Sequence, residues 1–120
     1  MSRRTEKVGE ELRSEIARLL REETGDPRIG LVSVTRVDVA PDLSHALVFW
    51  SALSTGEVGE EEVARIGDGL ESASAFLRGR LARLLPLKRA PELRFRYDPS
   101  LALGDRTLRL LREISDGEKA

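Results

Sequence analysis

The sequence predicts a single α+β domain in which helices cover one face of a three-stranded sheet. Two long tracts carry apolar residues at helical spacing, two β-branched segments are joined by a turn, and a shorter segment alternates apolar and basic residues. A chain of 120 residues leaves little core to divide between two domains. We therefore expect one domain over residues 1–115 and a short tail over residues 116–120.

The first tract predicts an N-terminal helix from about Arg3 to Thr24. Its apolar residues recur every three to four positions, with polar residues between them, as one face of an amphipathic helix requires. They are Val8, Leu12, Ile16, Leu19 and Leu20. Gly25, followed by Asp26-Pro27, supplies a C-terminal stop signal for this helix.

The next two segments predict an antiparallel hairpin. Leu31 to Val39 is rich in β-branched residues, but its apolar positions change parity along the segment, which indicates a bulge near Thr35 or Arg36. The link from Ala40 to Ser44 has turn chemistry, and Ala46 to Leu53 is a continuous apolar strand.

A second helical stripe runs from Val63 to Leu85 and stops before Pro86. Small residues interrupt it in the middle, at Ala73, Ser74 and Ala75, where a bend can be accommodated. We therefore predict two helices that meet at this kink, with Ala75 at negative φ because positive φ penalises alanine.

The last elements are a third strand and a short C-terminal helix. Leu93, Phe95 and Tyr97 alternate with Arg94 and Arg96, the pattern of a strand with one buried face. Beyond Gly104, residues 105–114 predict the helix. The expected order is helix, strand, strand, helix, helix, strand, helix.

Charge is segregated along the chain, although the net charge is only -1. Between Glu57 and Glu71, six acids face one base, whereas between Arg78 and Arg96 seven bases face one acid. The basic stretch predicts a footprint for a polyanion. Its members are Arg78, Arg80, Arg83, Lys88, Arg89, Arg94 and Arg96.

Helical geometry places Gly79 and Ala82 outward between Arg78 on one side and Arg80 and Arg83 on the other. Such a small surface would let a phosphate backbone approach while guanidinium groups pair with it. The alternative is an ordinary solvated arginine face. A mobile basic end, formed by Arg3, Arg4 and Lys7, can add further contacts.

Several motifs resemble those of the ribosome-binding factor A family, in the family's order and over nearly the whole chain. Pro91 to Ser100, with Gly104 beyond, is similar to the family's C-terminal signature. Three further segments match, namely Asp26 to Ile29, Val37 to Ser44 and Ala75 to Arg78.

The resemblance implies a type II KH-like domain, whose helices and three strands follow the order derived above. It also implies a non-enzymatic factor that binds the immature 30S small ribosomal subunit, contacts 16S rRNA, assists late maturation including 5′-end processing, and matters in cold growth. The family's Ala-x-Gly kink corresponds to Ala73, Ser74 and Ala75, so alanine replaces the family's glycine here. Gly56 to Gly59 has GxxG spacing but contains an acid, and we interpret it as a connector.

Composition argues against most enzyme classes. The chain has no cysteine and one histidine, His45, so a metal site is not expected, and no nucleophile motif or phosphate-binding loop is present. We expect no cofactor and no small-molecule substrate. The aromatic residues lie in apolar stripes, where core packing is a commoner fate than base stacking. They are Phe49, Trp50, Phe76, Phe95 and Tyr97.

No apolar run approaches the roughly 18 residues that cross a bilayer, and we expect a cytoplasmic protein, monomeric when free. Two alternatives to RNA binding remain open from sequence. One is a protein-protein adaptor whose basic face meets an acidic partner, and the other is an RNA-processing hydrolase without a recognisable motif.

Overall fold

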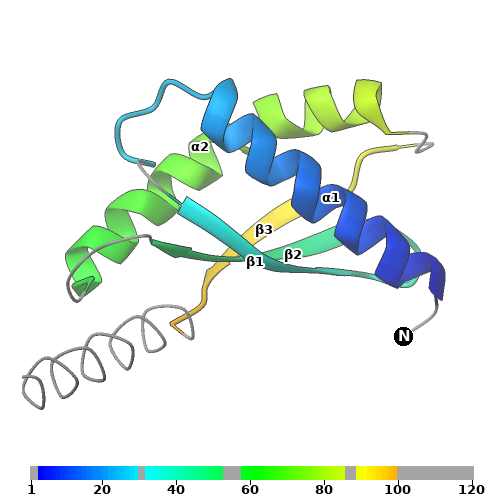
Figure 1. Cartoon of the computed structure of the whole chain (residues 1–120), viewed down its shortest axis with the longest axis horizontal. Coiled ribbons are helices and arrows are strands. Elements are labelled where there is room, and N and C mark those ends of the chain that lie inside the picture. The colour runs from blue at the N-terminus through cyan, green and yellow to red at the C-terminus, as the bar shows by residue number, and fades with distance from the viewer. Residues whose placement is uncertain (1–2, 30–31, 53–57, 86–88, 100–120) are drawn as a thin grey trace, which may run out of the picture.

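The computed structural model describes residues 3–29, 32–52, 58–85 and 89–99, which form five elements. They follow the order α1 (Arg3–Glu22), β1 (Val32–Val39), β2 (His45–Ala52), α2 (Glu60–Leu84) and β3 (Glu92–Tyr97). The predicted α+β, KH-like class is confirmed, with both helices on one face of the sheet (Figure 1). No helix in this part of the chain is long and apolar enough to cross a membrane.

Helix α1 packs its apolar stripe onto the sheet, mainly onto β1. Leu12, Ile16 and Leu19 are completely buried, as the periodicity predicts. The helix also comes very close to β1 at Gly9, where a Cβ atom would lie 2.7 Å from the carbonyl oxygen of Val37. Only glycine allows this approach without moving the helix or the strand.

The three strands form one sheet in the order β1-β2-β3. Strands β1 and β2 are antiparallel, and their register shifts between Val34 and Arg36, which confirms the predicted hairpin and bulge. Strand β3 lies parallel to β2 on its other side. The turn between β1 and β2 holds Leu43 at φ 63°, a left-handed conformation unusual for a branched side chain.

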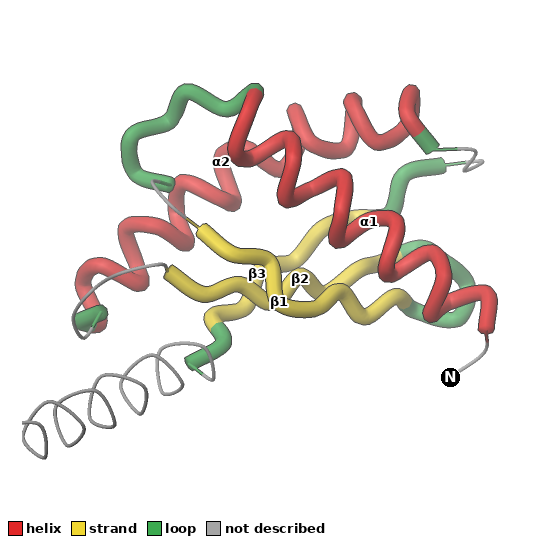
Figure 2. The backbone as a smooth tube through the Cα atoms, in the orientation of Figure 1, coloured by secondary structure: helices red, strands yellow, loops and turns green. Residues whose placement is uncertain are grey.

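The structure has one continuous helix where two were predicted. Helix α2 runs from Glu60 to Leu84 without a break, so the small residues Ala73, Ser74 and Ala75 lie inside it. Figure 2 shows that the two halves of α2 nevertheless point in different directions. Leu43 is the one non-glycine residue with positive φ among those described, so Ala75 has the expected negative φ. Helical hydrogen bonding continues through alanine and serine because neither residue forbids it.

Strand β3 has the predicted two faces. Leu93 is buried against the helices, whereas Arg94 and Arg96 are exposed on the other face. Phe95 and Tyr97 face the helices but are only half-buried, because β3 is an edge strand with no neighbour on its outer side. The ring of Tyr97 packs against that of the buried Trp50, with centroids 5.1 Å apart. The helix expected at residues 105–114 and the tail at 116–120 lie outside the described residues.

Candidate nucleic-acid interface

The predicted basic footprint divides between two surfaces. Arg78, Arg80 and Arg83 project from the second half of α2, whereas Arg94 and Arg96 project from the face of the sheet that the helices leave open. Arg89 is exposed in the segment that leads to β3, and Lys88 lies outside the described residues. A stretch that is continuous in sequence is therefore not one surface in the fold.

Arg78 is bound to the main chain. Its Nε donates to the carbonyl oxygen of Pro91 at 3.1 Å, and a terminal nitrogen donates to that of Ala90 at 3.3 Å. These bonds fix the segment before β3 to the side of α2. Two of the five N–H donors of this guanidinium are therefore occupied within the fold.

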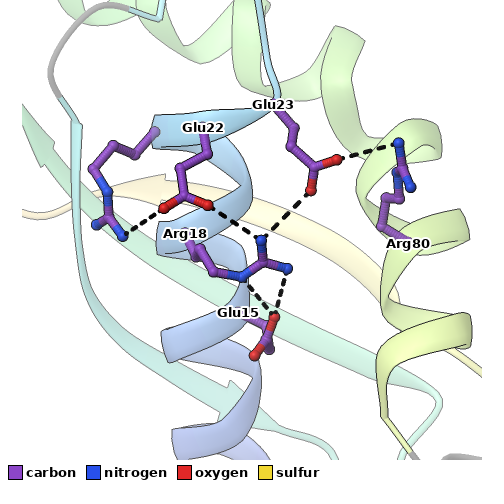
Figure 3. A network of polar contacts seen from close by, with 6 residues as sticks. Glu15, Arg18, Glu22, Glu23 and Arg80 are labelled. Carbon is purple, nitrogen blue, oxygen red and sulfur yellow. Dashed lines mark hydrogen bonds and ion pairs between the residues drawn. The ribbon is translucent and has the colours of Figure 1, made fainter.

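Arg80 is held by an acidic network at the end of α1 (Figure 3). Its guanidinium pairs with Glu23 at 3.2 Å, and Glu23 also lies 3.7 Å from Arg18. Arg18 in turn binds Glu15 and Glu22, and these hydrogen bonds raise the pKa of Arg18 above its ordinary value. The network joins α1 to α2 and fixes the position of the Arg80 side chain.

Arg83 differs from its two neighbours because none of the described residues forms an ion pair or hydrogen bond with it. Close by, Gly79 is exposed with open space around its Cα, since a Cβ there would meet nothing within 4 Å, and Ala82 is also exposed. The exposure of Gly79 and Ala82 is as helical geometry predicts, but of the three arginines predicted around them only Arg83 has no partner among the described residues.

Phe76 contradicts the expectation that the aromatic residues pack in the core. It is 38% exposed, although it lies in the same helix as the buried Leu77 and Leu81. One residue corresponds to 100° of helical rotation, so Phe76 lies outside the stripe that Leu77 begins. Helical periodicity could therefore have identified Phe76 from the sequence as an exposed residue.

The guanidinium of Arg80 lies over the ring of Phe76, with its carbon 5.4 Å from the ring centroid. We call the surface formed by Phe76, Gly79, Arg80, Ala82 and Arg83 the α2 outer face. Next to Phe76 it borders a shallow depression of about 250 Å³ between the end of α1 and the middle of α2. The residues that line the depression with Phe76 are Glu23, Thr24, Gly25, Asp26, Ser72 and Ala73.

The open face of the sheet has mixed charge. Arg36 pairs with Asp38 at 3.1 Å and covers the half-buried ring of Phe49 at 4.2 Å, and Arg94 pairs with Glu92 at 2.9 Å. Arg96 lies opposite Phe49 in the strand register. Acids therefore pair with Arg36 and Arg94 on this face, whereas Arg96 forms no ion pair with any described residue.

The other residues considered from the sequence do not belong to the α2 outer face. Arg3, Arg4 and Lys7 are exposed in the first two turns of α1, at the opposite end of that helix from Glu23. His45 is exposed, with Nε2 3.2 Å from a carboxylate oxygen of Glu92. No group of three or more potential metal-binding side chains occurs within the ranges that the structure describes.

A helix, a bulged hairpin, a long helix and a parallel third strand, with arginines along the long helix, define a small KH-like α+β domain. The sequence model of the ribosome-binding factor A family matches residues 4–111. This chain belongs to that family.

Close relatives agree with this membership. The chain is 43% identical to ribosome-binding factor A of Azoarcus sp. (strain BH72) over 108 residues, which cover 90% of this chain and 82% of the relative. It is also 43% identical to that of Pseudomonas syringae pv. syringae (strain B728a) over 101 residues, which cover 84% and 72% of the two chains.

Solved structures of the family share the fold. The crystal structure of ribosome-binding factor A from Thermus thermophilus superimposes with a TM-score of 0.66 at 26% identity, covering 78% of this chain and 93% of that one. A homology model of the Thermus thermophilus factor, fitted into a cryo-EM map of its complex with the 30S subunit, gives a TM-score of 0.53 at 29% identity and covers 74% and 93%.

Proposed function

We propose that this chain binds the 30S ribosomal subunit, contacts 16S rRNA through the α2 outer face, and assists late maturation of the subunit, including 5′-end processing of the RNA. It acts by binding, without catalysis or a cofactor, as a monomer in the cytoplasm. Membership of a family of ribosome-binding factors supports this function, as does the 30S complex of the Thermus thermophilus relative.

The observation that carries the RNA contact is Arg83, which projects without a described ion-pair partner beside the open backbone at Gly79. A guanidinium forms bidentate hydrogen bonds with phosphate, and the absence of a bulky side chain at Gly79 lets a sugar-phosphate backbone approach the helix. Arg80 adds positive charge at the edge of this surface, although Glu23 neutralises part of it.

Sedimentation through sucrose gradients tests the proposal, with purified protein mixed with 30S or 50S subunits. The wild-type chain should travel with 30S subunits, and Arg83→Glu should weaken that association. Arg65→Glu is the matched control, because Arg65 is an exposed arginine of the same helix, in its acidic first half. Equal binding to 50S subunits, or an equal loss in both variants, would contradict a specific contact through Arg83.

A further inference from the structure

Phe76 and Leu84 are the two large apolar side chains that are exposed in the described part of the chain, and both belong to α2. A single exposed apolar residue is ordinary, so exposure alone does not make Phe76 a site. What sets Phe76 apart is that an ion-pair network lies beside it. The guanidinium of Arg80 lies over one face of its ring, which leaves the other face for a ligand. Glu23 pairs with Arg80, and Arg18 pairs with Glu23 (Figure 3).

The depression beside Phe76 suits a flat, uncharged group better than a phosphate. Its lining consists of small side chains and two carboxylates, those of Glu23 and Asp26. Asp26 accepts hydrogen bonds from the guanidinium and backbone of Arg28, which lower the pKa of its carboxyl to about 2 and keep it ionised. Both carboxylates are already paired, Asp26 with Arg28 and Glu23 with Arg80, so the depression offers no free cation to a phosphate.

The cation of the α2 outer face that is available to a phosphate is Arg83. Arg83 lies seven residues after Phe76, which is two helical turns along α2. Gly79 lies between them in the helix and has open space around it. Along two turns of α2 the surface therefore offers an aromatic ring beside a recess that has no free cation, and a guanidinium beside open backbone. Those are the two features that recognise a nucleotide with an unpaired base.

We propose that Phe76 is a stacking platform for an unpaired base, so that the RNA bound at the α2 outer face includes a single-stranded nucleotide. The base lies on Phe76 at the depression, and its phosphate faces Arg83. This inference rests on the proposed function and deepens it, because it names the form of RNA that the surface takes. In a duplex the bases are paired and stacked on one another, so they cannot occupy Phe76.

The test compares two probes, a short single-stranded oligo(A) and an RNA duplex of the same length, by fluorescence anisotropy at low salt. Phe76→Leu removes the aromatic ring but leaves an apolar side chain at an exposed helical position, so the fold should be retained. It should weaken oligo(A) binding by about 5- to 150-fold, the usual loss for one base-aromatic stack, and leave duplex binding unchanged. Leu84→Ala, at the other exposed apolar position, should leave both unchanged.

Phe76→Trp supplies an independent readout. It should retain oligo(A) binding, and its indole fluorescence should be quenched by oligo(A) against the constant signal of the buried Trp50, the single tryptophan of the natural chain. The proposal is overturned if the wild-type chain fails to bind oligo(A), if Phe76→Leu binds it normally, or if that variant weakens both probes equally.

Arg83→Glu separates this inference from the function on which it rests. If Arg83→Glu weakens 30S binding while Phe76→Leu has no effect on oligo(A), the stacking role is wrong and the basic contact stands. If Arg83→Glu leaves 30S binding intact, the α2 outer face is not the RNA surface, and the stacking proposal is refuted with it.

Discussion

Replacing Gly9 by alanine should destabilise the fold even though alanine is the better helix former. In the interior of a helix, Gly→Ala is worth up to about 1 kcal/mol in favour of alanine. At Gly9, however, the new Cβ atom would lie 2.7 Å from the carbonyl oxygen of Val37. Real Cβ atoms do not approach an oxygen that closely, so α1 or β1 has to move.

The cost of that movement can be estimated. The obstructing atom belongs to the main chain of Val37, which pairs with Val48 within the β1–β2 ladder, so it cannot rotate away as a side chain would. Overpacking of this kind costs about 1–3 kcal/mol, and the helical gain offsets part of it. We expect a net loss of about 1–2 kcal/mol, which lowers the Tm by roughly 4–8 °C in a domain of this size.

Gly79→Ala is the matched comparison, because Gly79 is also interior to a helix but has nothing within 4 Å of its Cβ position. It should raise the stability by up to about 1 kcal/mol. Thermal unfolding followed by circular dichroism measures both variants. A Tm for Gly9→Ala at or above that of the wild type would refute the close approach of α1 to β1.

Three further variants test other contacts. Arg78→Ala removes two hydrogen bonds to backbone carbonyls and should cost about 1–3 kcal/mol in urea unfolding, and an unchanged midpoint would show that the bonds are unimportant. Leu93→Ala, at 3% exposure, should cost about 2–5 kcal/mol and more than Phe95→Ala at its half-buried position, and the reverse order would contradict the burial described for β3. Because folding lowers the pKa of Asp26 from 3.8 to about 2, its stabilising contribution is present above about pH 4 and is lost as the pH falls toward 2; Asp26→Asn should flatten that part of the acid-unfolding curve, and an unaltered curve would argue against the pair with Arg28.

Local sequence patterns predicted the elements well because the physics they depend on is local. The change of parity between Val34 and Val37 requires an extra residue between them, and the bulge is there. The alternation around Arg94 and Arg96 likewise fixes the faces of β3. The parallel pairing of β3 with β2 is a long-range contact, and no pattern within either strand specifies it.

The candidate site was predicted only in part. A run of bases between Arg78 and Arg96 does not reveal that the chain turns between α2 and β3 and carries the last two arginines to the open face of the sheet. Nor does it reveal that Glu23, from the end of α1, neutralises Arg80. The exposure of Phe76 was missed because an aromatic residue next to an apolar stripe was counted with it.

The predicted break in α2 shows that residue types alone do not decide whether a helix is interrupted. Small residues at Ala73 to Ala75 predicted an interruption of the helix, but a helix is interrupted only where backbone hydrogen bonds are lost, and α2 continues through these residues. With alanine in place of glycine, nothing in the local sequence favours positive φ, and the helix continues.

The most direct test of the central claim is the salt dependence of 30S binding by the wild-type chain, Arg83→Glu and Arg65→Glu. Each phosphate contact contributes roughly one to the slope of log K against log salt concentration, so Arg83→Glu should bind more weakly and with a slope smaller by about one. Arg65→Glu should keep the wild-type slope, because Arg65 lies in the acidic half of α2. Identical slopes for the wild type and Arg83→Glu would contradict the assignment of the α2 outer face to RNA.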